Sequence, residues 1–151
     1  MPRRLLVLSI VWGILMSSNS IARSEDNSVK RDTLTKLDGA WRLVSYKPAG
    51  SGEYVDFPDG WQQIKLVVDG RFVWTLANDG KVSRSAGGKC VTLGDEYTEQ
   101  IEFVSDQSDE WMVGKTGAFT VKLDQNKLYL DGVIKSDKGV AKITEIWEHV
   151  K

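Results

Sequence analysis

The chain has 151 residues, one cysteine, one histidine and a formal net charge of −1 at neutral pH. This length predicts a single domain that can bury a core without disulfides. The charge balance excludes the basic surplus that binding to nucleic acid or to an anionic lipid surface requires. One cysteine cannot form a disulfide within the chain, and together with one histidine it cannot build a zinc cluster. We therefore expect no metal, no cofactor and no nucleic-acid partner.

The first segment of the chain has the pattern of an export signal. Residues 2–4 include two arginines, residues 5–16 are an apolar run of twelve, and residues 20–22 offer small side chains to a signal peptidase. Cleavage after Ala22 makes residues 1–22 a signal peptide and places the protein in the periplasm or outside a bacterial cell. Removal leaves 18 basic and 21 acidic residues. An uncleaved anchor is the alternative, although the run is shorter than the roughly 20 residues of a spanning helix.

Residues 23–36 are polar and predict a flexible linker. From residue 37 on, apolar and polar residues alternate with the period of a β-strand, and no segment has a sustained helical period. Asp69-Gly70 and Asp79-Gly80 are turn signals between strands, and Gly87-Gly88 marks a bulge, a corner of the sheet or a close approach to a ligand. Strands are predicted at residues 41–46, 64–68, 72–76, 81–93, 97–104, 111–113, 118–123, 127–134 and 140–149.

This pattern predicts an all-β fold in which residues 37–151 form an antiparallel up-and-down barrel of about 8–9 strands. Closure removes the exposed edges that such a sheet otherwise presents. Alternation then predicts which side chains point inward, because successive residues of a strand face opposite sides. The expected inward groups are Ile64, Leu66 and Val68; Phe72, Trp74 and Leu76; Tyr97, Glu99, Ile101 and Phe103; Phe119, Val121 and Leu123; Leu128 and Leu130; Ala141, Ile143, Glu145 and Trp147.

Glu99 and Glu145 are the two carboxylates on these inward faces. A carboxylate in an apolar interior is costly unless it is paired or hydrogen-bonded. The two acids therefore belong either to a structural polar network near a barrel end or to a ligand site. Paired acids also raise the question of glycosidase-like acid–base chemistry. Candidate partners for them are ordered water, a ligand, Arg42, Lys142, Tyr46 or Tyr97.

The single cysteine, Cys90, is expected to be buried as a small apolar side chain, with a disulfide to a second chain as the alternative. A catalytic role would have to recruit His149, three residues from the end of the sequence. No Gly-x-Ser-x-Gly nucleophile elbow and no phosphate-binding glycine loop is present. We therefore predict that the protein is not an enzyme.

Gly39-Ala40-Trp41 resembles the Gly-x-Trp signature of lipocalins and the wider calycin group. Residues 70–74, 80–88, 94–101 and 145–148 are similar to segments of small exported bacterial lipocalin-like domains of unknown function, and this resemblance covers residues 37–151. It implies a barrel with a binding cavity, in which Trp41 packs at the closed end. Lipocalins often place a cation over this tryptophan. The candidates for that cation here are Lys142 and Lys151.

The leading functional expectation is an exported, monomeric binding protein that holds a small, largely apolar or amphipathic molecule in the barrel, with no membrane span in the mature chain. The expected ligand-binding residues are Phe72, Trp74, Tyr97, Glu99, Phe103, Phe119 and Glu145. Barrel closure is assigned to Gly39, Trp41 and Trp147. The alternatives are a structural or interaction barrel of the cell envelope, filled by its own side chains, and a carboxylate-dependent barrel enzyme.

Overall fold

A computed structural model of the chain describes residues 37–137 and 139–151, so the predicted signal peptide and linker lie outside the described residues. No helix within these two ranges has the length and hydropathy to cross a bilayer. The elements in chain order are β1 (Gly39–Tyr46), β2 (Val55–Asp56), β3 (Trp61–Val68), β4 (Arg71–Asn78), β5 (Lys81–Leu93), β6 (Glu96–Val104), the 3₁₀-helix η1 (Gln107–Met112), β7 (Thr116–Asp124), β8 (Lys127–Ser136) and β9 (Gly139–His149).

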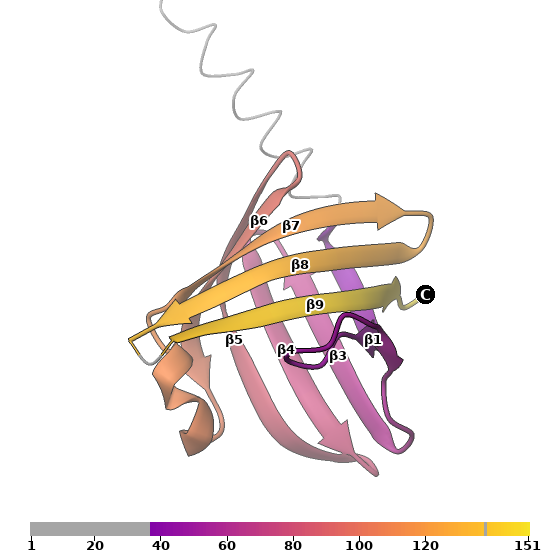
Figure 1. Cartoon of the computed structure of the whole chain (residues 1–151), viewed down its shortest axis with the longest axis horizontal. Coiled ribbons are helices and arrows are strands. Elements are labelled where there is room, and N and C mark those ends of the chain that lie inside the picture. Colours follow the sequence, from indigo (N-terminus) through magenta and orange to yellow (C-terminus); the bar gives the residue numbers. More distant parts are fainter. Residues whose placement is uncertain (1–36, 138) are drawn as a thin grey trace, which may run out of the picture.

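The predicted all-β barrel is confirmed. Strands β3 to β9 pair with their sequence neighbours in antiparallel fashion, and β1 pairs with both β3 and β9, which closes an eight-stranded barrel. The short strand β2 pairs with Ser45 and Tyr46, beyond the part of β1 that pairs with β3. In Figure 1, β7 to β9 cross in front of β3 to β5, as expected for strands that tilt around a closed barrel.

The tight hairpins follow from their turn residues. Asp69 and Gly70 have φ values of 48° and 74°, and Asp79 and Gly80 have φ values of 47° and 75°. Two consecutive left-handed residues are the signature of the two-residue turn whose twist matches that of the flanking strands. The predicted turns at both places are therefore confirmed.

One predicted element is wrong. Residues 111–113 were expected to form a short strand, but Trp111 and Met112 end the 3₁₀-helix η1. The helix begins after Asp106, whose carboxylate accepts a 2.8 Å hydrogen bond from the Ser108 amide. Asp109 lies in the first turn, where the helix dipole favours negative charge. A 3₁₀-helix of six residues is too short to show its period in the sequence.

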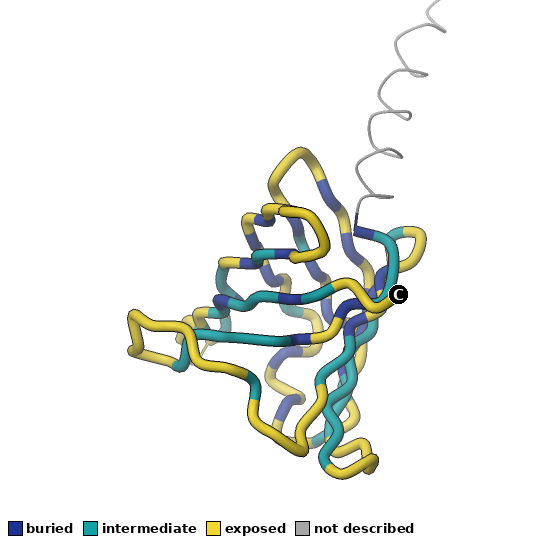
Figure 2. The backbone as a smooth tube through the Cα atoms, turned by 90° about the vertical axis from the view of Figure 1, so that its right-hand side faces the viewer, coloured by how far each residue is buried: buried dark blue, intermediate teal, exposed yellow. Residues whose placement is uncertain are grey.

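The end of the barrel where β1 begins is tightly packed. The apolar side chains buried there come from six strands and from the residue that precedes β1 by two positions: Leu37, Trp41, Val67, Phe72, Tyr97, Leu128 and Trp147. Figure 2 shows buried positions in dark blue at intervals along the strands. The Trp41 indole N–H donates a 2.8 Å hydrogen bond to the Leu37 carbonyl, so its one polar atom is satisfied. We call this region the closed half of the barrel.

The group that packs against Trp41 is not the predicted cation. The group packed against its ring is His149, edge-on at 5.0 Å between ring centroids, rather than Lys142 or Lys151. A side chain at Gly39 would meet the same imidazole, because a Cβ there would lie 2.7 Å from Nε2 of His149. Gly39, Trp41 and His149 therefore pack together where the first and last strands meet.

A β-bulge changes which side chains of β6 face the interior. The pairing of β5 with β6 shifts between Gly87 and Gly88, so that Gly88 pairs with Ile101 and Gly87 with Phe103. The two backbones approach closely there, since a Cβ on Gly88 would lie 1.9 Å from the Gln100 carbonyl oxygen. The paired glycines thus mark a bulge, as expected, in a continuous strand.

The prediction that Phe103 faces the interior is wrong as a consequence of this bulge. Gly88 and Gly87 are adjacent in β5, but their partners Ile101 and Phe103 are separated by Glu102, the extra residue of the bulge. Beyond Glu102, the inward and outward positions of β6 are therefore exchanged. Ile101 is buried, whereas Phe103 is 49% exposed and Val104 packs against the core instead. The Phe103 ring covers the backbone of Gly87 from outside.

The face of β3 that points into the barrel is also not the predicted one. Lys65 and Val67 point inward and are buried, whereas Leu66 and Val68 are 43% and 62% exposed. These outward side chains join Val73 and Phe103 along a shallow apolar groove on the outer surface. Leu66 and Val68 therefore cover the outside of the barrel, and the one lysine of β3 lies inside together with Val67.

A charged cavity inside the barrel

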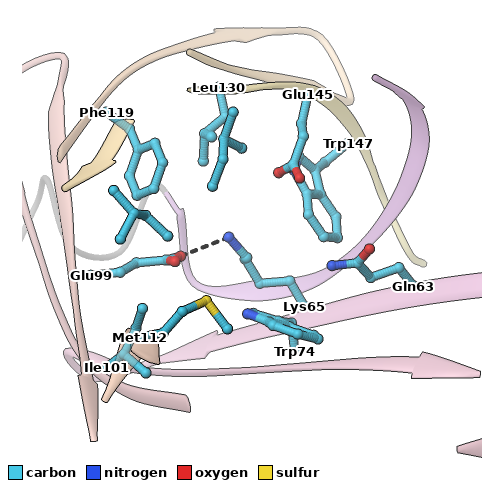
Figure 3. A pocket seen from close by; sticks show the side chains of 12 residues that line it. Gln63, Lys65, Trp74, Glu99, Ile101, Met112, Phe119, Leu130, Glu145 and Trp147 are labelled. Atoms are coloured by element: carbon cyan, nitrogen blue, oxygen red, sulfur yellow. Dashed lines mark hydrogen bonds and ion pairs between the residues drawn. The ribbon is translucent and has the colours of Figure 1, made fainter. Parts of the chain in front are cut away.

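The barrel encloses a cavity of about 100 Å³ above the closed half. Its walls are mostly apolar, and its polar groups come from β3, β6 and β9 (Figure 3). The apolar lining residues are Trp74, Ile101, Met112, Phe119, Leu130, Ile134, Ile143 and Trp147. The polar ones are Gln63, Lys65, Glu99 and Glu145. An apolar pocket with a few convergent polar groups is the usual form of a small-molecule site.

A buried ion pair crosses the barrel beside this cavity. The Nζ of Lys65 on β3 lies 2.6 Å from Oε1 of Glu99 on β6, and both residues are only 4% exposed. The partner of Glu99 is therefore Lys65. Arg42, one of the expected partners, instead pairs on the exterior with Glu148 at 2.7 Å. Because each charge is desolvated, loss of either member leaves the other uncompensated, which typically costs about 3–5 kcal/mol.

Aromatic rings surround the same ammonium group. The Nζ of Lys65 lies 5.0 Å from the centroid of the Trp147 ring, 5.9 Å from that of Tyr97 and 6.0 Å from that of Phe72. Aromatic faces attract cations through their quadrupole, and the attraction is strongest where water is excluded. The rings and Glu99 together hold Lys65 in place between the cavity and the closed half.

Glu145 is the second carboxylate of the cavity, and its environment differs from that of Glu99. Its Oε2 accepts a 3.0 Å hydrogen bond from the indole N–H of Trp147, two residues further along β9. Burial raises the pKa of Glu145, Lys65 and the Trp147 hydrogen bond act in the opposite direction, and Glu99 raises it further. The carboxyl group is half-buried and projects into the cavity, as Figure 3 shows.

Cys90 and Tyr97 lie below the ion pair. Cys90 is opposite Glu99 in the β5–β6 register and is a free, buried thiol, which confirms its expected burial. Burial raises the pKa of this thiol to about 11, although the Tyr97 hydroxyl partly opposes the shift. Burial also raises the pKa of Tyr97, and the neighbouring Glu99 and Cys90 raise it further. A thiol with such a pKa is not an activated nucleophile.

The mouth of the cavity lies at the opposite end of the barrel from Trp41. Met112, the last residue of η1, lines the cavity on one side, and Gln63 of β3 lines it on the other. The helix is attached to β5 by Arg84, whose Nε donates a 2.7 Å hydrogen bond to the buried carboxylate of Asp109. The position of Met112 therefore depends on this attachment.

The structure brings together most of the predicted site. Five of the predicted residues line the cavity: Trp74, Glu99, Phe119, Glu145 and Trp147. Phe72 and Tyr97 are buried beneath it and contact Lys65 rather than the cavity. Phe103 lies outside the barrel.

Sequence reasoning missed Lys65, Gln63 and Met112. Lys65 alternates with Val67 on β3, and that spacing was the available signal for an inward lysine.

A protein-family model described as a domain of unknown function (DUF4488) matches residues 36–151, the whole of the barrel. The chain belongs to the DUF4488 family. A comparison with curated proteins found no match.

The chemistry available to this DUF4488 domain is limited by its side chains. Within residues 37–137 and 139–151, no three histidine, cysteine, aspartate or glutamate side chains are grouped so that they could hold a metal ion. The family match carries no enzyme class. What the cavity offers is an ion pair that is satisfied internally, one carboxyl group with a single hydrogen-bond donor, and apolar walls.

Proposed function

We propose that this DUF4488 domain is an exported, lipocalin-like binding protein that holds a small, largely apolar molecule in the barrel cavity. The supporting observation is the arrangement of the cavity, in which a few polar side chains lie within mostly apolar walls. Trp74, Phe119 and Trp147 offer contact area, and Glu145 offers a polar anchor. No catalytic step is part of this proposal.

The volume of the cavity constrains the ligand. At about 100 Å³ it exceeds the space of a single water, which needs roughly 10–15 Å³ on the same scale. It is smaller than the roughly 300–1,000 Å³ of most small-molecule pockets. We infer that a ligand inserts one end of a few non-hydrogen atoms, and that the rest occupies the mouth beside Gln63 and Met112.

The proposed site of action is the periplasm or the extracellular medium. The pattern of residues 1–22 supports export, because a basic start, a short apolar run and small residues before Ala22 are what a signal peptidase recognises. We propose a monomer, since closure of the barrel leaves few strand edges for pairing with a second copy.

The proposal is tested by native mass spectrometry of the protein purified from its own host. We expect a co-purified small molecule in the wild type and its loss in Ile143→Phe, which fills the cavity from β9. The control is Ile64→Phe, an equal enlargement on the outward face of β3. Bound molecule in all three proteins, or in none of them together with no uptake of a fluorescent apolar probe, contradicts the proposal.

A filled structural barrel is the second candidate. The observation in its favour is that Lys65 and Glu99 satisfy each other at 2.6 Å without a ligand, in a cavity of modest volume. In that case Ile143→Phe should raise the melting temperature, because it fills empty space, and no preparation should contain a bound molecule. The same set of variants therefore separates the two candidates.

A further inference from the structure

The three charged groups of the cavity do not balance. Lys65 supplies one positive charge, and Glu99 and Glu145 supply two carboxyl groups. Lys65 contacts Glu99 at 2.6 Å, whereas Glu145 forms no ion pair within 4.0 Å among the described residues. Burial of the Glu145 carboxyl raises its pKa, and the nearby Glu99 raises it further. The attraction of Lys65 and the hydrogen bond from Trp147 oppose this shift only in part. The cavity therefore has one carboxyl group without a cation.

The surroundings of Glu145 suit a cationic hydrogen-bond donor. Trp147 already donates to Oε2 at 3.0 Å, which leaves the other oxygen as an acceptor that faces the cavity. Trp74 and Trp147 contribute aromatic surface to the same cavity. Hydrogen bonds between an ammonium and a carboxylate are about twice as strong as neutral ones, and aromatic faces add to the attraction. An anionic ligand would instead meet the excess of carboxylates.

We propose that the cavity recognises a primary ammonium group, which binds the free oxygen of Glu145 while a short apolar chain lies along the walls. This inference rests on the proposed binding function and names its ligand class, an amphipathic monoamine. Lys65 does not take the place of the ligand, because its Nζ is paired with Glu99 at 2.6 Å, is flanked by three aromatic rings and forms no ion pair with Glu145 within 4.0 Å. Glu145 is the residue that recognises the ligand, and Glu99 positions Lys65.

The test compares three probes of similar size and different charge: n-butylammonium, 1-butanol and butyrate, titrated by calorimetry at neutral pH and constant ionic strength. The proteins are the wild type, Glu145→Gln and Glu148→Gln, a matched control on the exterior of β9 that pairs with Arg42. In the wild type and the control, we expect n-butylammonium to bind about tenfold more tightly than 1-butanol, as a charge-assisted hydrogen bond allows. In Glu145→Gln this preference should disappear while binding of 1-butanol remains.

The outcomes separate this inference from the function on which it rests. If 1-butanol binds the wild type as tightly as n-butylammonium, or if Glu145→Gln keeps the preference, the ammonium site is disproved and the binding function stands. If none of the three probes binds, both fail. Melting curves of the variants show whether Glu145→Gln is folded, and Glu145→Asp, which keeps the charge, should retain a preference for the ammonium.

Discussion

The two halves of the barrel are formed by the same sheet but differ in how their interiors are packed. In the closed half, Trp41, Leu128 and Trp147 are at most 3% exposed, and the only polar atom of the Trp41 ring is satisfied by a backbone carbonyl. In the cavity half, Gln63, Trp74 and Ile143 are only half-buried, and an ion pair and a carboxyl group replace apolar contacts. The closed half has a densely packed apolar interior, which favours stability. The cavity half has unfilled space and charged groups in its interior.

The Lys65–Glu99 pair marks the boundary between the halves. A buried ion pair is weak evidence for stability, because apolar residues of similar size often serve as well or better. The pair lines a cavity that contains a further carboxyl group, which is the arrangement expected under the proposed binding function. The predictions that follow change one half or the other and measure the difference.

The largest expected effect is in the closed half. Trp41→Ala should lower the free energy of unfolding by about 4 kcal/mol, because it removes a fully packed aromatic ring and leaves a void at the end of the barrel. Trp61→Ala is the control, since Trp61 is 40% exposed and should matter much less. Denaturant unfolding measures both. Equal losses for the two variants would show that Trp41 does not close the barrel.

The next effect is at the boundary. Glu99→Gln should cost about 3 kcal/mol, because it leaves the buried ammonium of Lys65 without a counter-charge. Glu102→Gln, which disrupts exposed pairs on the same strand, should change stability little. The double variant Lys65→Met with Glu99→Leu should recover most of the loss. If the single variant unfolds like the wild type, the pair is not formed in solution.

A smaller, pH-dependent effect is expected in the cavity half. Because the pKa of Glu145 is raised on folding, the folded state holds this proton more tightly, and the resulting stability is lost as pH rises from about 4.5 through the folded pKa. Glu145→Gln should therefore melt at a higher temperature than the wild type at neutral pH and at a similar temperature at pH 4.

Glu148→Gln should behave in the opposite way. The hydrogen bond from Arg42 lowers the pKa of Glu148, so its stabilising effect is present at neutral pH and lost as the pH falls through the folded value. Melting temperatures recorded from pH 3 to 8 for both variants check these signs. A Glu145→Gln protein that is less stable at neutral pH would mean that its carboxylate is fully compensated in the folded state.

The smallest expected effect concerns the thiol of the closed half. Cys90 is buried with a pKa of about 11, so thiol reagents should react with it only as fast as the protein unfolds. Reducing agent should leave the melting temperature unchanged. Rapid labelling of the native protein, or a dimer on non-reducing electrophoresis that reductant dissolves, would place this thiol at the surface.

Much of the architecture was predictable from local pattern. The turns at Asp69-Gly70 and Asp79-Gly80 need left-handed residues, and the strict alternation of Tyr97, Glu99 and Ile101 leaves one apolar face. These are properties of a few neighbouring residues, so no tertiary information is needed to find them. The inward positions of Glu99, Glu145 and Trp147 were found in this way.

What alternation cannot decide is which of two similar faces points inward. On β3, the face of Leu66 and Val68 is more apolar than that of Lys65 and Val67, yet the second face is buried. The reason lies three strands away in the sequence order, since Lys65 neutralises Glu99 across the barrel. Phe103 was placed wrongly for a related reason, because the bulge beside Gly88 shifts the register only when β5 and β6 pair.

The sequence by itself determined most of the strands, the turns and the presence of two inward carboxylates, since each depends on neighbouring residues. Only the tertiary structure decided the partner of Glu99, the lack of an ion-pair partner for Glu145 among the described residues, and the volume of the cavity. Charge compensation and packing depend on distances between residues that are remote in the chain, and closure of the barrel sets these distances.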